Sequence, residues 1–112
     1  MITLQIHFVI ADGKTAAFEK LYAQVYVPAL RKQVGYVRSQ LLRVFPRDVA
    51  REIDAFADDF NYQMELVFDT EANRRSWVVS PEHQTAWPQA SGLADKVVWR
   101  GFDIAGCDQE TL

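Results

Sequence analysis

The sequence predicts an α+β fold of the ferredoxin-like type, a βαββαβ sandwich with an antiparallel sheet. Three observations support this prediction. Apolar residues alternate with polar ones at the start, in the middle and near the end of the chain, which indicates strands. Apolar residues at helical spacing follow the first strand and a later one. The resulting order of strand, helix, strand, strand, helix, strand is that of the split βαβ arrangement.

The chain has 112 residues, of which 49 % are hydrophobic and 24 % charged. This is the size and composition of one soluble domain, and we expect a single domain over residues 1–112, with its core in 2–104 and a tail in 105–112. No apolar run approaches the roughly 20 residues that span a bilayer, and no basic leader precedes the first strand. We therefore expect a cytoplasmic protein without a membrane partner.

Charge and cysteine content exclude several classes of site. The formal net charge of -3 and the scattered arginines argue against a nucleic-acid partner. The single cysteine, Cys107, excludes an internal disulfide and a cysteine-based metal cluster. Asp58 and Asp59 are adjacent acids without a further paired ligand, which favours a solvated turn over a metal site. Phosphate loops and dinucleotide motifs are absent, so the sequence predicts neither a metal nor another cofactor.

The first strand should cover residues 2 to 10, where one face collects Ile2, Leu4, Ile6, Phe8 and Ile10. A turn follows, and Thr15 is a fair N-cap for the next helix. That helix should bury a stripe made of Phe18, Leu21, Tyr22, Val25 and Ala29. Pro28 removes an amide donor inside it, so we expect a kink or break near Val27. Gly35 should end the helical segment.

The second strand is expected between about Tyr36 and Phe45, with Leu41 and Leu42 on opposite faces. Residues 46 to 60 are ambiguous. Three apolar residues in this stretch have helical spacing, but the stretch also fits a long extended hairpin connection.

Residues 61 to 87 carry the clearest pattern and most of the candidate chemistry. A strand here places four large apolar groups on one face: Tyr62, Met64, Leu66 and Phe68. Asp69 or Thr70 then caps a helix. Asn73 and Trp77, four residues apart, should lie on one face of that helix.

This helix should stop near Ser80, because Ser80-Pro81-Glu82 is a second start signal: a capping hydroxyl, a proline at the first helical position and an acid. Residues 90 to 96 are predicted to form a loop that contains Ser91-Gly92. The last strand is expected from Val97 to about Ile104. One of its faces should carry Val98, Arg100, Phe102 and Ile104.

Two helices can cover only one face of a four-stranded sheet. The other face would carry the mixed side chains Gln5, His7, Gln63 and Glu65. Apolar residues such as Val9 and Val67 would share that face, which makes it an aggregation liability in a monomer. We therefore expect a homodimer that forms through this sheet face.

Four features together resemble a known family: the first strand, the helix Phe18…Tyr22…Pro28-Ala29-Leu30-Arg31…Gly35, the strand Leu41-Leu42-Arg43, and the helix pair Trp77…Ser80-Pro81-Glu82-His83-Gln84. They resemble the antibiotic-biosynthesis-monooxygenase type of dimeric α/β-barrel protein, in which two such sheets pack face to face. The resemblance covers roughly residues 2 to 104. It indicates fold more than activity, because the superfamily includes oxygenases, haem-degrading enzymes, isomerases and proteins with no known reaction.

The resemblance implies a cofactor-independent monooxygenase for a small aromatic, phenol-like or quinol-like substrate. In family members that act on aromatic polyketides, an asparagine and a tryptophan four residues later line the cavity, with a tyrosine six residues beyond and an arginine near the last strand. Asn73 and Trp77 match the first two residues. His83 stands at the tyrosine position, and Arg100 is an approximate match for the arginine. Such groups can stabilise an oxyanion, stack on a flat ring and move protons near pH 7.

Three of these residues also have a structural interpretation: Trp77 as a core anchor, Asn73 as a solvated helix residue and His83 as a helix cap. His7 fits either a hydrogen-bonding position at the dimer seam or a position in the substrate site. A non-enzymatic ligand-binding or stress-associated dimer is the alternative function, because the same aromatic residues would line its pocket equally well: Tyr22, Tyr62, Trp77 and Trp87.

Haem degradation is the nearest enzymatic alternative. That subfamily shares Trp77, but it uses an asparagine in the first strand and a haem-ligating histidine ten residues after the tryptophan. Here His7 and Trp87 stand approximately at those places. The axial ligand is therefore missing unless His83 replaces it on a shifted helix, and haem is not expected.

Overall fold

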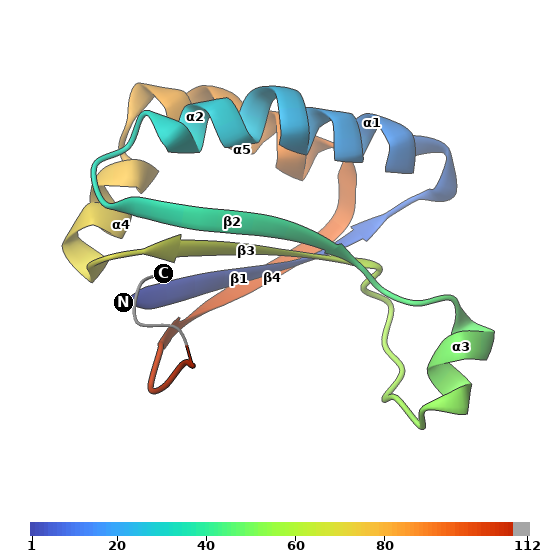
Figure 1. Ribbon diagram of the computed structural model, residues 1–112. Coiled ribbons are helices and arrows are strands. Elements are labelled where there is room, and N and C mark those ends of the chain that lie inside the picture. The colour runs from blue at the N-terminus through green and yellow to red at the C-terminus, as the bar shows by residue number, and fades with distance from the viewer. Residues whose placement is uncertain (109–112) are drawn as a thin grey trace.

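A computed structural model describes residues 1–108. Four strands form one antiparallel sheet in the order β2-β3-β1-β4, and helices cover one of its faces (Figure 1). The strands are β1 (Ile2–Ile10), β2 (Tyr36–Arg43), β3 (Tyr62–Phe68) and β4 (Ala94–Asp103). This is the ferredoxin-like α+β arrangement that the sequence predicts. None of the helices in residues 1–108 is long and apolar enough to cross a membrane.

The first helical segment is continuous instead of broken at Pro28. It consists of η1 (Asp12–Lys14), α1 (Thr15–Leu21), the π-helical turn η2 (Tyr22–Tyr26) and α2 (Val27–Arg31). Of the expected kink or break near Val27, the break is wrong: the backbone stays helical there, and the π-helical turn just before Pro28 accommodates the missing amide. The turn also shifts the buried stripe, so that Tyr26 and Leu30 enter the core.

Two further predicted boundaries are wrong. Thr15 is the first residue of α1 instead of its N-cap, and its hydroxyl donates to the carbonyl of Asp12 at 3.1 Å. The helix α5 (Pro81–Gly92) includes Ser91-Gly92, and β4 starts at Ala94, so residues 90 to 96 do not form a loop. The helix continues to this point because Ala90 is fully buried against the core.

Side-chain alternation divides the sheet into an inner face under the helices and an outer face that the helices leave uncovered. The predicted inner face of β3 is confirmed, since Tyr62, Met64, Leu66 and Phe68 are all buried. On the outer face, side chains that are paired across neighbouring strands form rows. The central row consists of Gln40, Glu65, Gln5 and Arg100. The Glu65 carboxylate accepts hydrogen bonds from Gln5 at 2.9 Å, from Gln63 at 3.0 Å and from Gln40.

Residues 46 to 60 combine the two alternatives that the sequence left open. The short helix α3 (Arg47–Glu52) is followed by a stretch without regular structure that leads to β3. In Figure 1, α3 lies beyond one end of the sheet, on the side opposite α1, α2 and α5. Asp58 and Asp59 are exposed, and the Asp58 carboxylate accepts from the backbone N–H of Phe60 at 2.9 Å.

Gly35 joins α2 to β2 in a left-handed backbone conformation that favours glycine. Its φ is +82°, and a Cβ placed there would lie 2.2 Å from Oδ1 of Asp69 and 2.4 Å from Nδ2 of Asn73. We expect Gly35→Ala to lower the free energy of unfolding by roughly 2–4 kcal/mol, because the left-handed conformation and the clash both add cost. Urea melts would measure the loss. Gly13→Ala is the control, since nothing lies within 4 Å of its Cβ position. Equal losses in the two variants would contradict this explanation.

Candidate functional site

A cavity of about 240 Å³ lies between the inner face of the sheet and the helices α4 (Glu71–Val78) and α5. Its walls are mainly apolar and aromatic, as in small-molecule sites. The sheet contributes Leu4, Ile6, Leu66 and Trp99, and the helices contribute Tyr26, Arg74, Trp77, Val78, His83 and Trp87. All three tryptophans of the chain therefore line this one cavity.

Two helix caps hold the ring-bearing side chains in place. The Thr70 hydroxyl accepts from the backbone N–H of Asn73 at 3.1 Å, which starts α4 so that Trp77 is buried on its inner side. The Ser80 hydroxyl accepts from the backbone N–H of His83 at 3.2 Å and starts α5. Both helix starts that the sequence predicts are confirmed.

The His83 imidazole lies among the tryptophans. Its ring centroid is 4.9 Å from that of Trp77, edge to face, and 6.1 Å from that of Trp87, nearly parallel. Within residues 1–108 no protein group forms a hydrogen bond with the imidazole. Burial lowers the pKa of His83 below its ordinary value of about 6.5. The ring is therefore neutral near pH 7 and able to accept a proton from a ligand.

Tyr26 brings a second polar group to the cavity wall. Its side chain is buried and meets Trp77 edge to face, with ring centroids 5.7 Å apart. Burial raises the pKa of the Tyr26 hydroxyl, which therefore stays protonated. Among the described residues it has no hydrogen-bond partner, so it is available as a donor to a bound molecule.

Arg74 is the charged residue of the cavity. It also lines a wider vestibule of about 430 Å³, to which Glu71, Gly101 and Asp103 contribute. Leu4, Arg74 and Trp99 line both spaces, so the vestibule leads into the cavity between them. Trp99 is 57 % exposed and stands at this opening, with its ring edge-on to that of Trp87.

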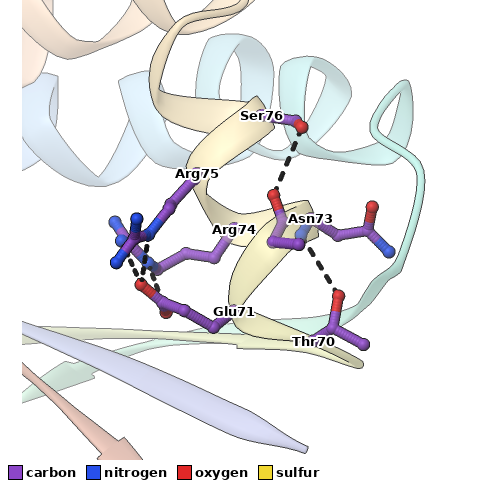
Figure 2. A network of polar contacts seen from close by, with 7 residues as sticks. Thr70, Glu71, Asn73, Arg74, Arg75 and Ser76 are labelled. Atoms are coloured by element: carbon purple, nitrogen blue, oxygen red, sulfur yellow. Dashed lines mark hydrogen bonds and ion pairs between the residues drawn. The ribbon is translucent and has the colours of Figure 1, made fainter.

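Figure 2 shows the guanidinium groups of Arg74 and Arg75 meeting at the Glu71 carboxylate. Arg74 donates through Nε at 2.9 Å and Nη2 at 2.6 Å, and Arg75 donates through Nε at 3.1 Å. These hydrogen bonds lower the pKa of Glu71 to about 2. The Arg74 side chain is 22 % exposed and that of Arg75 is 75 % exposed. Nη1 of Arg74 has no partner among the described residues and remains available to bind an anion.

Of Asn73 and Trp77, which were both expected to line the cavity, only Trp77 does so. Trp77 faces the cavity, whereas Nδ2 of Asn73 donates to Oδ1 of Asp69 at 2.8 Å, next to Gly35. Asn73 lies next to Trp77 on the helix surface but outside the inner side of α4, which is centred on Arg74, Trp77 and Val78. Asn73 therefore joins the start of α4 to the turn before β2.

Arg100 and His7 lie on the outer face of the sheet, away from the cavity. Arg100 pairs across strands with Gln5, and its guanidinium lies 5.1 Å from the centroid of the Phe102 ring. His7 contacts the ring of Phe60, with centroids 5.6 Å apart. The alternation of β1 and β4 accounts for this, since residues next to inward-facing ones point outward.

Tyr22 and Tyr62 line a separate, shallow depression of about 220 Å³. The Tyr62 hydroxyl donates to the Glu19 carboxylate, which is also paired with Arg43 at 2.7 Å. The Tyr22 hydroxyl lies 2.7 Å from Oγ of Ser39. Both tyrosines connect α1 and η2 to β2 and β3, and neither reaches the tryptophan-lined cavity.

Three cavity residues with polar or aromatic side chains were not among the predicted site residues: Tyr26, Arg74 and Trp99. Arg74 had a signal in the sequence, because positions 74, 77 and 78 share one face of a helix. Trp99 also had a signal, because it precedes Arg100 in the last strand and successive side chains of a strand point to opposite faces of the sheet. Tyr26 also had a signal, since it lies eight residues after Phe18 and four after Tyr22, at helical spacing from both. In residues 1–108 no three His, Cys, Asp or Glu side chains are grouped to hold a metal ion.

No protein-family model and no curated protein matches the chain. Solved structures do match. The cofactor-independent oxygenase SnoaB from Streptomyces nogalater has a TM-score of 0.73, at 22 % sequence identity over 97 % of both chains. A candidate antibiotic biosynthesis monooxygenase from Nitrosomonas europaea has a TM-score of 0.68, at 12 % identity over 92 % of this chain and 97 % of that one.

A dimeric ferredoxin-like protein of unknown function from Jannaschia sp. has a TM-score of 0.72, at 13 % identity over 92 % of this chain and 98 % of that one. These identities establish likeness of fold and leave activity open. The chain has the ferredoxin-like fold of the antibiotic-biosynthesis-monooxygenase-like proteins.

Proposed function

We propose that the chain is a cofactor-independent monooxygenase for a small, flat phenol-like or quinol-like substrate that binds in the tryptophan-lined cavity. The observation that carries the proposal is that three indoles, a neutral imidazole and a guanidinium line one cavity. Indoles stack on aromatic rings, and a base next to a cation can generate and hold a phenolate. The fold shared with the oxygenase SnoaB supports the same class of reaction.

In this reaction His83 accepts the phenolic proton, and Nη1 of Arg74 stabilises the phenolate oxygen together with the Tyr26 hydroxyl. The phenolate then donates electrons to O2 directly. A ring carbon exchanges its hydrogen for one atom of O2 as a carbonyl oxygen, and the other atom leaves as water with that hydrogen and the phenolic one. The phenol becomes a quinone, so the substrate supplies all four electrons that O2 accepts.

A non-enzymatic ligand-binding protein is the second candidate. The wide opening at the exposed Trp99 favours it, since an oxygenase that handles reactive anions gains from excluding water. Binding alone requires only the apolar walls, and in that case His83 and Arg74 would contribute little beyond orientation.

Intrinsic fluorescence and oxygen consumption separate the candidates. Because every tryptophan of the chain lines the cavity, an aromatic ligand that enters it should quench most of the emission. We expect quenching under anaerobic conditions and oxygen uptake in air with the same polycyclic phenol. Quenching without uptake across a panel of phenols would favour the binding protein. If a panel of phenols produced no quenching and no oxygen uptake, the cavity would be excluded as the site.

We also propose a homodimer that forms through the outer face of the sheet. Large apolar side chains on this face are exposed in the single chain: Leu42, Val98 and Phe102. Dimerisation would cover them and remove an aggregation liability. The fold shared with the dimeric protein from Jannaschia sp. supports this arrangement.

A further inference from the structure

The segment between β2 and β3 presents an unusual amount of apolar surface. We define the arm as residues 44–60, which include α3. Four of its large hydrophobic side chains are exposed: Val44, Phe45, Ile53 and Phe56. Phe56 is 87 % exposed, so it packs on almost nothing in its own chain. Such a concentration of exposed apolar side chains marks an interaction surface.

The arm is continuous with the outer face. At its base the backbone N–H of Val44 donates to the carbonyl of Asn61 at 2.9 Å. At its other end the Phe60 ring contacts His7 and lies 5.0 Å from Nζ of Lys96, and both of these residues are on the outer face. α3 itself lies on the side of the sheet opposite α1, α2 and α5 (Figure 1). A partner that covered the outer face would therefore meet the arm.

Charge indicates which partner fits. The arm carries Asp48, Glu52, Asp54, Asp58 and Asp59 against Arg47 and Arg51, a net charge of -3. The rows of the outer face carry Arg38, Lys96 and Arg100 against Glu65, a net charge of +2 with histidine neutral. The arm and the outer face therefore complement each other. Each copy has one acidic arm and one basic outer face. In a dimer with a two-fold axis, the arm of each copy can therefore contact the outer face of the other.

Interface size points the same way. A stable interface takes about 800 Å² of accessible surface from each partner. The exposed apolar side chains of the arm would add to the surface that the outer face buries in a dimer. The arm projects on the required side (Figure 1).

We infer that the arm of each copy closes over the outer face of a second copy of this chain and clamps the homodimer. The inference rests on the proposed dimer and adds the segment that stabilises it. It also assigns a function to the acidic residues of the arm, which steer it onto the basic face of the partner.

Sedimentation equilibrium of the full chain tests the clamp. We expect a dimer for the wild type at micromolar concentration and a dissociation constant raised on the order of 100-fold by Ile53→Asp combined with Phe56→Asp. The matched control is Val34→Asp combined with Val79→Asp, which alters two side chains that are 79 % and 76 % exposed and lie outside the arm and the outer face. The control should leave the dimer intact, and circular dichroism should show every variant folded.

A charge-reversed arm, Asp58→Lys with Asp59→Lys, should weaken the dimer at low salt and have less effect near 1 M salt, where charges are screened within about 3 Å. A monomeric wild type would overturn both the clamp and the proposed dimer. A dimer that persists equally in the wild type and in both arm variants would overturn the clamp alone.

Discussion

Replacing His83 with glutamine is expected to lower the rate of oxygen uptake with a polycyclic phenol on the order of 100-fold, because the cavity loses its base. Glutamine retains much of the side-chain volume. The cap of α5 also survives, since it is the backbone N–H of residue 83 that donates to Ser80. Fluorescence quenching should therefore persist with an affinity within a few-fold of the wild type. An oxygen electrode and an anaerobic titration would measure the two quantities.

The same residue sets an expected pH dependence. Burial lowers the pKa of His83, so the neutral, proton-accepting form persists to a pH below the ordinary value of about 6.5. The rate should be constant above that pH and fall as the pH drops through the lowered pKa, where the imidazolium can no longer accept a proton. His83→Gln should lack this acidic limb. A midpoint above 6.5 in the wild type would contradict the assignment.

His7→Gln is the matched control, because His7 and His83 are the two histidines of the chain and lie on opposite faces of the sheet. It should leave both the rate and the acidic limb unchanged. If His7→Gln lowered the rate as much as His83→Gln, the histidine effect would come from the dimer or the fold and not from the cavity.

The parts of the fold that depend on local pattern were predictable from the sequence. β1 has the predicted bounds, and the inner residues of β3 are the predicted ones. In a sheet with one buried face, the alternation of apolar and polar residues determines which side chains point inward. The caps at Thr70 and Ser80 were predictable because a hydroxyl and a nearby amide suffice. Errors occurred where tertiary packing decides: a π-helical turn accommodates Pro28, and burial of Ala90 extends α5 through Ser91-Gly92.

The candidate site divides in the same way. Trp77, His83 and Trp87 come together because they follow two correctly placed caps within a short stretch of chain. Whether a strand residue reaches the cavity depends on which face of the sheet its side chain points to. The sequence correctly grouped Val98, Arg100 and Phe102 on one face of β4, but this face is the outer one, so Arg100, the arginine expected from the resemblance, lies away from the cavity. Asn73 was matched by its spacing to Trp77 alone, and a four-residue spacing does not say which side of the helix faces the sheet.

Two neighbouring arginines allow the anion-binding role to be tested against a closely matched control. Arg74 and Arg75 both pair with Glu71, but only Arg74 lines the cavity. Either substitution by glutamine leaves Glu71 with one guanidinium. Arg74 donates two of the three hydrogen bonds to Glu71, but the structural cost to α4 should stay small in both variants, as is usual for partly exposed ion pairs, and urea melts would measure it. Any large difference between the two variants must therefore come from the cavity.

We expect Arg74→Gln to lower the rate of oxygen uptake about 100-fold, because removing one donor to a developing oxyanion in a water-poor site typically costs 100-fold to 1,000-fold. Arg75→Gln should stay within a few-fold of the wild type. Arg100→Ala completes the comparison, since Arg100 is the arginine that the family resemblance indicates and it lies across the sheet from the cavity. A loss of activity in Arg100→Ala with full activity in Arg74→Gln would move the reacting centre to the outer face and the dimer interface. A loss confined to Arg74→Gln would place the phenolate oxygen at the mouth of the cavity, where the vestibule and the tryptophan-lined chamber meet.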